Sequence, residues 1–173
     1  MKPRNGPSEL DPLVSQGSPT DKMAPGLDER SLASTLGSVP AAQRVLFILL
    51  VEDNPSNQRL LLRMLQRSGH RVVVADNGKD AVALASSQYF DLIFMDIEMP
   101  ILDGIKASLE IRALEKSLST SKKTHIVAMA EHVQEENQQR FSSAGMDGFL
   151  QKPIDRAAVA RILGEIGRVK VDT

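Results

Sequence analysis

From residue 44 onward, the sequence alternates short apolar runs with longer amphipathic segments, and this alternation occurs five times. Repeated strand-then-helix patterns are typical of a parallel sheet that is covered by helices on both faces. The apolar runs are nearly continuous, as expected for strands buried on both sides. The pattern therefore predicts an α/β fold, with strands at residues 45–51, 71–75, 91–95, 125–130 and 147–150.

Five helices are predicted between and after these strands, at about residues 55–68, 78–88, 104–117, 132–143 and 155–167. The last helix is the clearest, because Asp155 can cap it and its apolar residues follow the i, i+3, i+4, i+7 rule. The fourth helix has few apolar residues to bury, namely Val133, Phe141 and the following Ala144. We therefore expect the fourth helix to be among the least stable elements of the domain.

The first 43 residues differ in composition from the rest of the chain. They contain 16 Pro, Gly or Ser residues and no aromatic residue. Such a segment cannot bury enough apolar surface to offset its chain entropy. We predict a disordered extension over residues 1–43, one domain over residues 44–168 and a short tail over residues 169–173.

The charges after residue 43 are balanced, with 17 basic and 17 acidic groups. A neutral domain without a basic stripe argues against nucleic acid as a partner. The chain has no cysteine, which excludes disulfides and thiolate metal sites. No segment approaches the roughly 20 apolar residues that span a bilayer. We expect a soluble intracellular chain, cytoplasmic or nuclear, whose His70, His125 and His132 share no metal-ligand spacing and lie at the surface.

Three of the predicted strands end on charged side chains. The first runs into Glu52 and Asp53, the third into Asp96, and the fifth into Lys152. Ligands bind at the carboxyl edge of open parallel sheets, so these groups are expected at one rim. Clustered carboxylates without a cation raise one another's pKa, and an oxygen-only site suits Mg²⁺. A carboxylate nucleophile, a divalent ion and a lysine together indicate phosphoryl transfer onto an aspartate.

Three motifs in order resemble the receiver domain of two-component signalling. They are Ile48-Leu-Leu-Val-Glu-Asp-Asn-Pro55, Phe94-Met-Asp-Ile-Glu-Met-Pro100 followed by Asp103-Gly104, and Gly145-Met-Asp-Gly-Phe-Leu-Gln-Lys-Pro153. The first is most similar to receivers attached to hybrid histidine kinases. The resemblance implies a flavodoxin-like, doubly wound sheet with strand order 2-1-3-4-5, the order for which a receiver is a standard example.

The resemblance also implies residue roles. Asp96 would accept a phosphoryl group from a phosphohistidine, and Lys152 would pair with it. Mg²⁺ would be held by Asp53, Asp96 and the backbone carbonyl of Glu98, with Glu52 acting through a bound water. The expected partner is a histidine kinase or a histidine phosphotransfer protein. The surface of the fourth helix, fifth strand and fifth helix would carry the output to a downstream protein or a second copy. The chain would catalyse only its own phosphorylation and dephosphorylation.

The fourth strand departs from the family pattern. Receivers usually end this strand on a threonine or serine, whereas this chain has Ala130 followed by Glu131. The family's aromatic switch position is occupied by Phe149, and its lysine–proline peptide is expected to be cis. Without a hydroxyl at residue 130, we expect Phe149 to favour an inward position even without phosphate.

Other functions remain open at this point. Ala130 and Glu131 favour an interaction module whose output is independent of phosphate, but Glu52, Asp53, Asp96 and Lys152 would be unnecessary for docking alone. Glu98 resembles the second acid of a metal-dependent aspartyl phosphatase, although Pro100 and Asp103-Gly104 match the receiver turn. A flavin-binding module shares the fold but would need a Ser/Thr-rich phosphate loop.

Overall fold

The computed structural model describes residues 44–118 and 122–168. Within them, strands and helices alternate as predicted, and the α/β fold is confirmed. The predicted extension and tail lie outside the described residues. The strands are β1 (Phe47–Val51), β2 (Arg71–Ala75), β3 (Leu92–Asp96), β4 (His125–Ala130) and β5 (Gly148–Gln151). The helices are α2 (Pro55–Arg67), α3 (Gly78–Ser87), α4 (Gly104–Ser117), α5 (Glu135–Ser143) and α6 (Arg156–Gly167).

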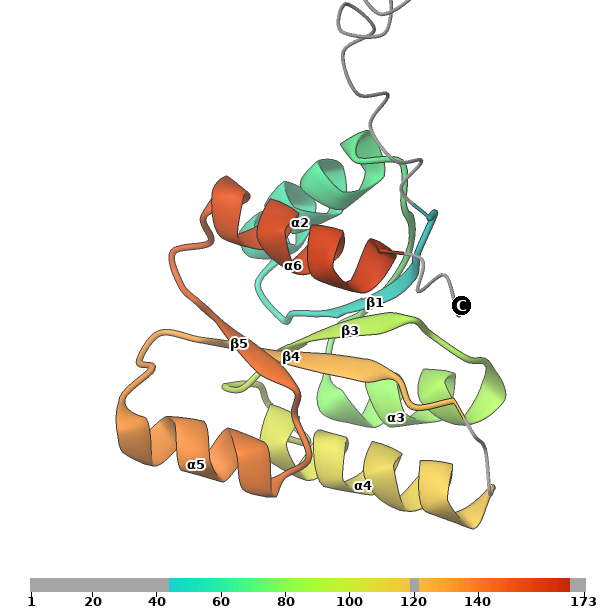
Figure 1. The fold of residues 1–173 in the computed structure, drawn as a ribbon. Helices are drawn as coiled ribbons and strands as arrows, with labels where there is room; N and C mark the ends of the chain where they lie inside the picture. The colour runs from blue at the N-terminus through green and yellow to red at the C-terminus, as the bar shows by residue number, and fades with distance from the viewer. Residues whose placement is uncertain (1–43, 119–121, 169–173) are drawn as a thin grey trace, which may run out of the picture. The chain divides into compact units, whose positions relative to one another are not determined.

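The five strands form one parallel sheet in the order β2-β1-β3-β4-β5 (Figure 1), which confirms the predicted strand order. The three central strands are almost entirely buried, whereas the edge strands β2 and β5 are only partly buried. The chain reverses direction along the sheet between β2 and β3, so β1 and β3 flank the switch point of the doubly wound topology.

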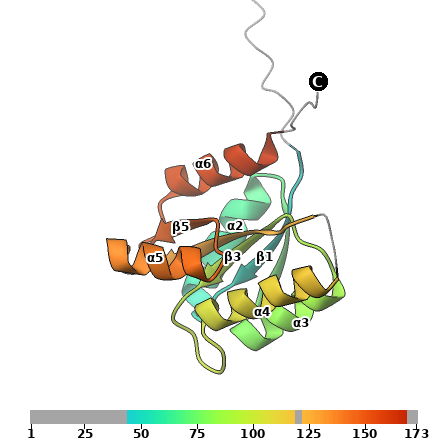
Figure 2. The ribbon, with the colours of Figure 1, turned by 60° about the horizontal axis from the view of Figure 1, so that its bottom comes forward.

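Helices cover both faces of this sheet. Figures 1 and 2 show α2 and α6 on one face and α3, α4 and α5 on the other. Side chains alternate along each strand, so Ile48 and Leu50 pack with α2 and α6 while Leu49 and Val51 pack with the opposite cluster. Among the described helices, none has the length and apolar character needed to cross a membrane.

Helix α5 is as weakly anchored as its sequence indicates. It begins at Glu135 rather than at residue 132, and no side chain caps its first turn. Phe141 is the one buried residue within this fully described helix. Val133 is half-buried before it, and Ala144 is buried after it. Because little apolar surface holds α5 to the sheet, the structure supports its place at the low-stability end of the domain.

The balanced net charge conceals a basic face on α2, so the prediction that the domain lacks a basic stripe is wrong. Arg59, Arg63 and Arg67 lie at i, i+4 and i+8 and are all exposed. Residues at this spacing share one side of a helix. The sequence of α2 contains no acidic residue to balance them.

His70 is the second correction, because the structure buries this side chain at 7% exposure. Its Nδ1 accepts a hydrogen bond from the Leu46 amide at 3.2 Å, and its buried Nε2 has no partner among the described residues. Burial lowers the pKa of His70. The neutral ring thus satisfies the amide before β1, whereas His132 is exposed as predicted and His125 is half-buried.

This burial predicts a pH-dependent stability. Below about pH 6.5, the ordinary histidine pKa, the unfolded chain takes up a proton that the folded chain resists. The free energy of unfolding should therefore fall as pH decreases, by at most about 1.4 kcal/mol per pH unit. His70→Asn keeps an acceptor for Leu46 and should remove this part of the pH dependence in urea titrations. His132→Asn is the surface control, and equal pH slopes in the wild type and His70→Asn would contradict the assignment.

Candidate functional site

The site begins where β1 and β3 end next to each other. Val51 is paired with Met95 in the parallel register, so the residues after them emerge at the same edge of the sheet. Glu52 and Asp53 come directly after Val51, and Asp96 is the last residue of β3. Carboxylate oxygens of these three acids lie within 4.8 Å of one another. The structure thus brings together the three acids predicted from separate strand ends.

The three carboxylates differ in their exposure to solvent. Glu52 is fully buried, Asp96 is 3% exposed, and Asp53 is exposed. Together they line a cavity of about 150 Å³, to which Glu98, Ala130, Glu131 and Lys152 also contribute. The Glu98 amide lies 3.3 Å from Asp96 Oδ1 and donates to it. Two desolvated acids and one solvent-facing acid therefore share a small opening.

Lys152 supplies the positive charge of this cavity. Its Nζ donates to Asp96 Oδ2 at 2.8 Å and lies 3.0 Å from Glu52 Oε2. The Lys152 backbone is fixed by its amide, which donates to the Ala130 carbonyl at 2.8 Å as β5 ends. The peptide bond between Lys152 and Pro153 is cis, as expected. One ammonium thus joins two buried carboxylates that come from different strands.

The proton affinities of the site reflect this crowding. Burial raises the pKa of Asp96 to about 6, and the Glu52 charge acts in the same direction, while the Lys152 hydrogen bond opposes both. Burial alone would lower the pKa of Lys152, but the hydrogen bond to Asp96 and the ion pair with Glu52 outweigh it, so the pKa is raised. The lysine therefore remains protonated, and the Asp96 carboxylate takes up a proton more readily than an ordinary aspartate.

The donor set fits a hard divalent cation. Every ligand offered is a carboxylate oxygen, and Glu52 Oε2 is buried without a hydrogen-bond partner among the described residues. Few protein oxygens at an open cavity suit Mg²⁺, which keeps several of its own waters. A second positive charge would also relieve the repulsion among the acids.

The loop after Asp96 requires a glycine. A Cβ on Gly104 would lie 2.0 Å from the Asp96 carbonyl oxygen, so only glycine lets α4 begin so close to β3. Asp103 caps α4 by accepting from the Lys106 amide at 2.9 Å. Ile101, in the same loop, has a φ of 72° and is 76% exposed. The Asp103-Gly104 motif therefore fixes the turn that follows Asp96 and packs against its backbone.

Sequence reasoning missed two residues that hold Glu52. The Asn54 amide and the Asn57 side-chain amide each lie 3.2 Å from Glu52 Oε1 and donate to it. The Asn54 side chain also caps α2. The signal in the sequence is that two asparagines, Asn54 and Asn57, follow the adjacent acids Glu52 and Asp53. Each asparagine has N–H groups that can donate to a buried carboxylate.

The expected inward position of Phe149 is wrong in this structure. Its side chain is 42% exposed and lines a groove of about 430 Å³ between α5 and β5. Ala130 is 7% exposed and belongs to a buried cluster that includes Phe141 and Met146. Since protein interiors are close-packed, omission of the hydroxyl leaves a packed methyl group rather than an open channel for the ring.

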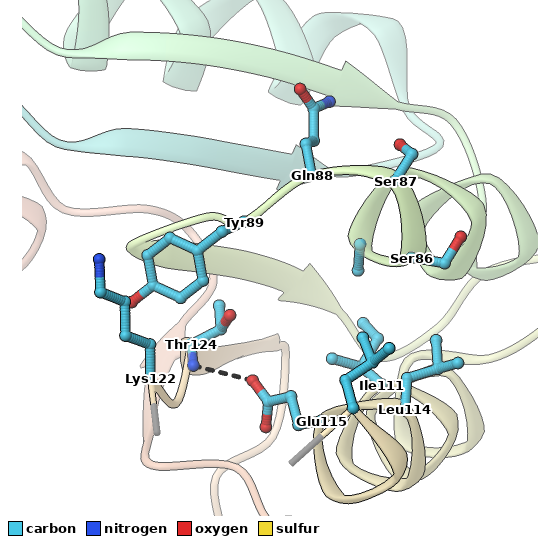
Figure 3. A pocket seen from close by; sticks show the side chains of 11 residues that line it. Ser86, Ser87, Gln88, Tyr89, Ile111, Leu114, Glu115, Lys122 and Thr124 are labelled. Atoms are coloured by element: carbon cyan, nitrogen blue, oxygen red, sulfur yellow. Dashed lines mark hydrogen bonds between the residues drawn. The ribbon is translucent and has the colours of Figure 1, made fainter. Parts of the chain in front are cut away.

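A second hollow, of about 230 Å³, lies at the opposite edge of the sheet (Figure 3). Tyr89 and Thr124, which precede β3 and β4, line it together with side chains of α3 and α4. Glu115 accepts from the Thr124 amide at 2.8 Å, and Lys122 Nζ lies 5.6 Å from the Tyr89 ring centre. None of the acids around Asp96 contributes to this hollow.

Comparison with known proteins agrees with this geometry. Residues 48–163 match the family model of the response regulator receiver domain. The chain is 37% identical over 141 residues to the sensor histidine kinase AruS of Pseudomonas aeruginosa. That alignment covers 80% of this chain but 14% of the kinase, so the chain spans only a small part of this relative.

Solved structures show the same fold. The receiver domain of a Pseudomonas aeruginosa sensor histidine kinase, with magnesium in its active-site cleft, is 39% identical and superimposes with a TM-score of 0.64. That match covers 72% of this chain and all of the other. A Saccharomyces cerevisiae co-crystal, of the histidine phosphotransfer protein Ypd1 with the receiver domain of Ssk1, matches at 28% identity with a TM-score of 0.71. It covers 76% of this chain and 98% of the matched chain. Since the family model matches most of its length, this chain belongs to the response regulator receiver domain family.

Proposed function

We propose that this chain is a phosphoacceptor in a phosphorelay, in which Asp96 receives a phosphoryl group from a partner's phosphohistidine. The observation that carries the proposal is the Lys152 ammonium, 2.8 Å from Asp96 and 3.0 Å from Glu52, beside the exposed Asp53. In the reaction, an Asp96 carboxylate oxygen attacks phosphorus as the histidine N–P bond breaks, and the ring nitrogen leaves with the bonding electrons. Lys152 moves from the carboxylate to the new phosphoryl oxygens, so its charge stabilises the product.

The metal in this proposal is Mg²⁺, held by Asp53, Asp96 and the Glu98 carbonyl, with Glu52 acting through water. The carboxylate donor set and the magnesium in the Pseudomonas receiver support it. When bound, the ion neutralises charge on the phosphoryl oxygens. The chain's own residues provide the nucleophile, orient it through Lys152 and the Glu98 amide, and turn over no external metabolite.

The proposed donor is a histidine kinase or a histidine phosphotransfer protein. The Ypd1–Ssk1 co-crystal supports this class, because it pairs a phosphotransfer protein with a similar receiver. For output we propose the surface of α5, β5 and α6, toward a downstream protein or a second copy. The weak packing of α5 and the exposed Phe149 support an element that moves when its contacts change.

A second candidate is a docking module whose output ignores phosphate. Ala130 favours it, because a methyl group at the mouth of the cavity cannot hydrogen-bond a phosphoryl oxygen. The buried Asp96–Lys152 pair opposes it, since burying charges is costly and docking alone gives no reason to retain them.

The acceptor assignment predicts one phosphorylation site. Incubation of the chain with Mg²⁺ and acetyl phosphate should add one phosphate to the wild type, measured by intact mass. Asp96→Asn should gain none, because an amide oxygen is a poor nucleophile. Equal labelling of both proteins would refute Asp96 as the acceptor.

The metal assignment makes opposite predictions for affinity and stability. Asp53→Asn should weaken Mg²⁺ binding in a calorimetric titration, because one ligand charge is lost. In metal-free buffer the same variant should melt at a higher temperature, because like-charge repulsion is relieved. This effect is about 1 kcal/mol for charges 4 Å apart in water, the limit suited to an exposed group. Unchanged Mg²⁺ affinity would show that the cavity is not the metal site.

The missing hydroxyl predicts a weak conformational response. A ligand shifts a two-state equilibrium only through differential interaction with the two states, and Ala130 offers the phosphoryl group no hydrogen bond. Ala130→Thr should therefore enlarge the NMR shift changes across residues 131–150 when beryllofluoride, a phosphate mimic, is added. A larger response in the wild type would show that the switch runs by another route.

A further inference from the structure

Glu52 presents two unlike oxygens. Oε1 accepts hydrogen bonds from the Asn54 backbone amide and the Asn57 side chain, each at 3.2 Å. Oε2 lies 3.0 Å from the Lys152 ammonium and accepts no hydrogen bond from the described residues. Because Glu52 is fully buried, bulk solvent does not surround either oxygen, and a lost contact would leave a desolvated group. One oxygen of Glu52 is held by the two asparagine groups, and the other faces the Lys152 ammonium in the cavity.

A carboxylate needs such an anchor to hold its orientation. The terminal torsion of glutamate is broad, so the carboxylate plane rotates at little cost unless hydrogen bonds fix it. The Asn54 amide is one donor, and it belongs to the backbone. The second donor is the Asn57 side-chain amide, 3.2 Å from the same oxygen of the Glu52 carboxylate. Rotation of Glu52 is therefore restrained by a side chain that mutation can remove.

Asn57 is itself rigidly placed. It lies in the first turn of α2, where Pro55 begins the helix and the Asn54 side chain accepts from the amides of Ser56 and Asn57. These capping contacts use backbone groups of residue 57, so they persist when its side chain is replaced. The side chain of Asn57 also lines the same cavity as Asp53 and Asp96. The Asn57 side chain is therefore not needed to cap the helix, and its amide is free to hold Glu52.

We propose that Asn57 is a positioning residue that sets the affinity of the cavity for Mg²⁺ by holding Glu52. Its amide anchors Oε1 and thereby turns Oε2 toward the cavity, where a metal-bound water and Lys152 can use it. The inference rests on the proposed function only in naming the metal. Partners that orient a ligand in this way typically change metal affinity by about 10–100-fold when mutated.

The first measurement is calorimetric Mg²⁺ binding by the full chain. Asn57→Ala should raise the dissociation constant for Mg²⁺ about 10-fold. Ser56→Ala is the matched control, because Ser56 lies in the same turn and is exposed. Far-UV circular dichroism and a thermal melt check that α2 is intact. If it is not, Asn57→Leu, which keeps the branched shape of the side chain but has no donor, replaces the alanine variant. An unchanged dissociation constant, or an equal loss in Ser56→Ala, overturns the proposal.

A double-mutant cycle then tests whether Asn57 acts through Glu52. In a Glu52→Gln background there is no carboxylate to hold, so Asn57→Ala should cause no further loss of Mg²⁺ affinity. An undiminished loss in that background would show that Asn57 acts directly or through the helix, and would overturn the proposal.

Phosphorylation by acetyl phosphate separates this inference from the proposed function. At saturating Mg²⁺ the Asn57→Ala rate should return to the wild-type value, because the nucleophile and Lys152 are unchanged. A rate that stays low at saturating Mg²⁺ would contradict a role in affinity alone. Failure of the proposed function would show itself instead as phosphate labelling of Asp96→Asn. That result would not change the interpretation of the Mg²⁺ titrations of Asn57→Ala.

Discussion

The bridge from Lys152 to Asp96 and Glu52 is the interaction on which the rest of the site depends. Three strands end within reach of one another only because the sheet order places β1 beside β3 and the β4–β5 pairing carries Lys152 to the same edge. Without the ammonium, two buried carboxylates would face each other, and breaking a buried ion pair costs about 3–5 kcal/mol. The fold thus brings mutually repelling carboxylates together at the carboxyl edge of the sheet, and the Lys152 ammonium offsets this repulsion.

The same bridge also holds the Asp96 carboxylate and the Lys152 ammonium in the positions that the proposed reaction requires. The Lys152 ammonium, 2.8 Å from Asp96, stabilises an anion whose burial otherwise favours protonation. In the proposed transfer, charge moves from the carboxylate to a phosphoryl group, and the lysine is already within reach, so little reorganisation would be required. Glu52 restrains the lysine from the other side, and the asparagine amides restrain Glu52. In this series of contacts, each polar group therefore restrains the orientation of the next.

Hydrophobic periodicity and the residues at strand ends were enough to predict the five strands and the core of the site, whereas the strand order came from the family resemblance. Apolar runs located all five strands, and charged residues at three strand ends located Glu52, Asp53, Asp96 and Lys152. Prediction failed where the outcome depends on tertiary packing. A lone histidine carries no mark of burial, so the surface position expected for His70 was wrong, and a balanced total charge hid the basic face of α2. Asn57 is ordinary until its amide is seen against Glu52.

Ala130 shows why motif spacing predicts position better than behaviour. Its place at the rim was correct, because register and strand length are set by backbone pairing. The consequence drawn for Phe149 was wrong, because it treated the missing hydroxyl as free space, whereas the interior around Ala130 is filled by apolar side chains. A phosphate-dependent switch, as proposed, would therefore need a group that connects the cavity to the segment before α5. Glu131 is such a group, since it lines the cavity and lies four residues before α5 begins. Repulsion between its carboxylate and a phosphoryl group would act on the segment that leads into the most weakly packed helix, without any hydroxyl at residue 130.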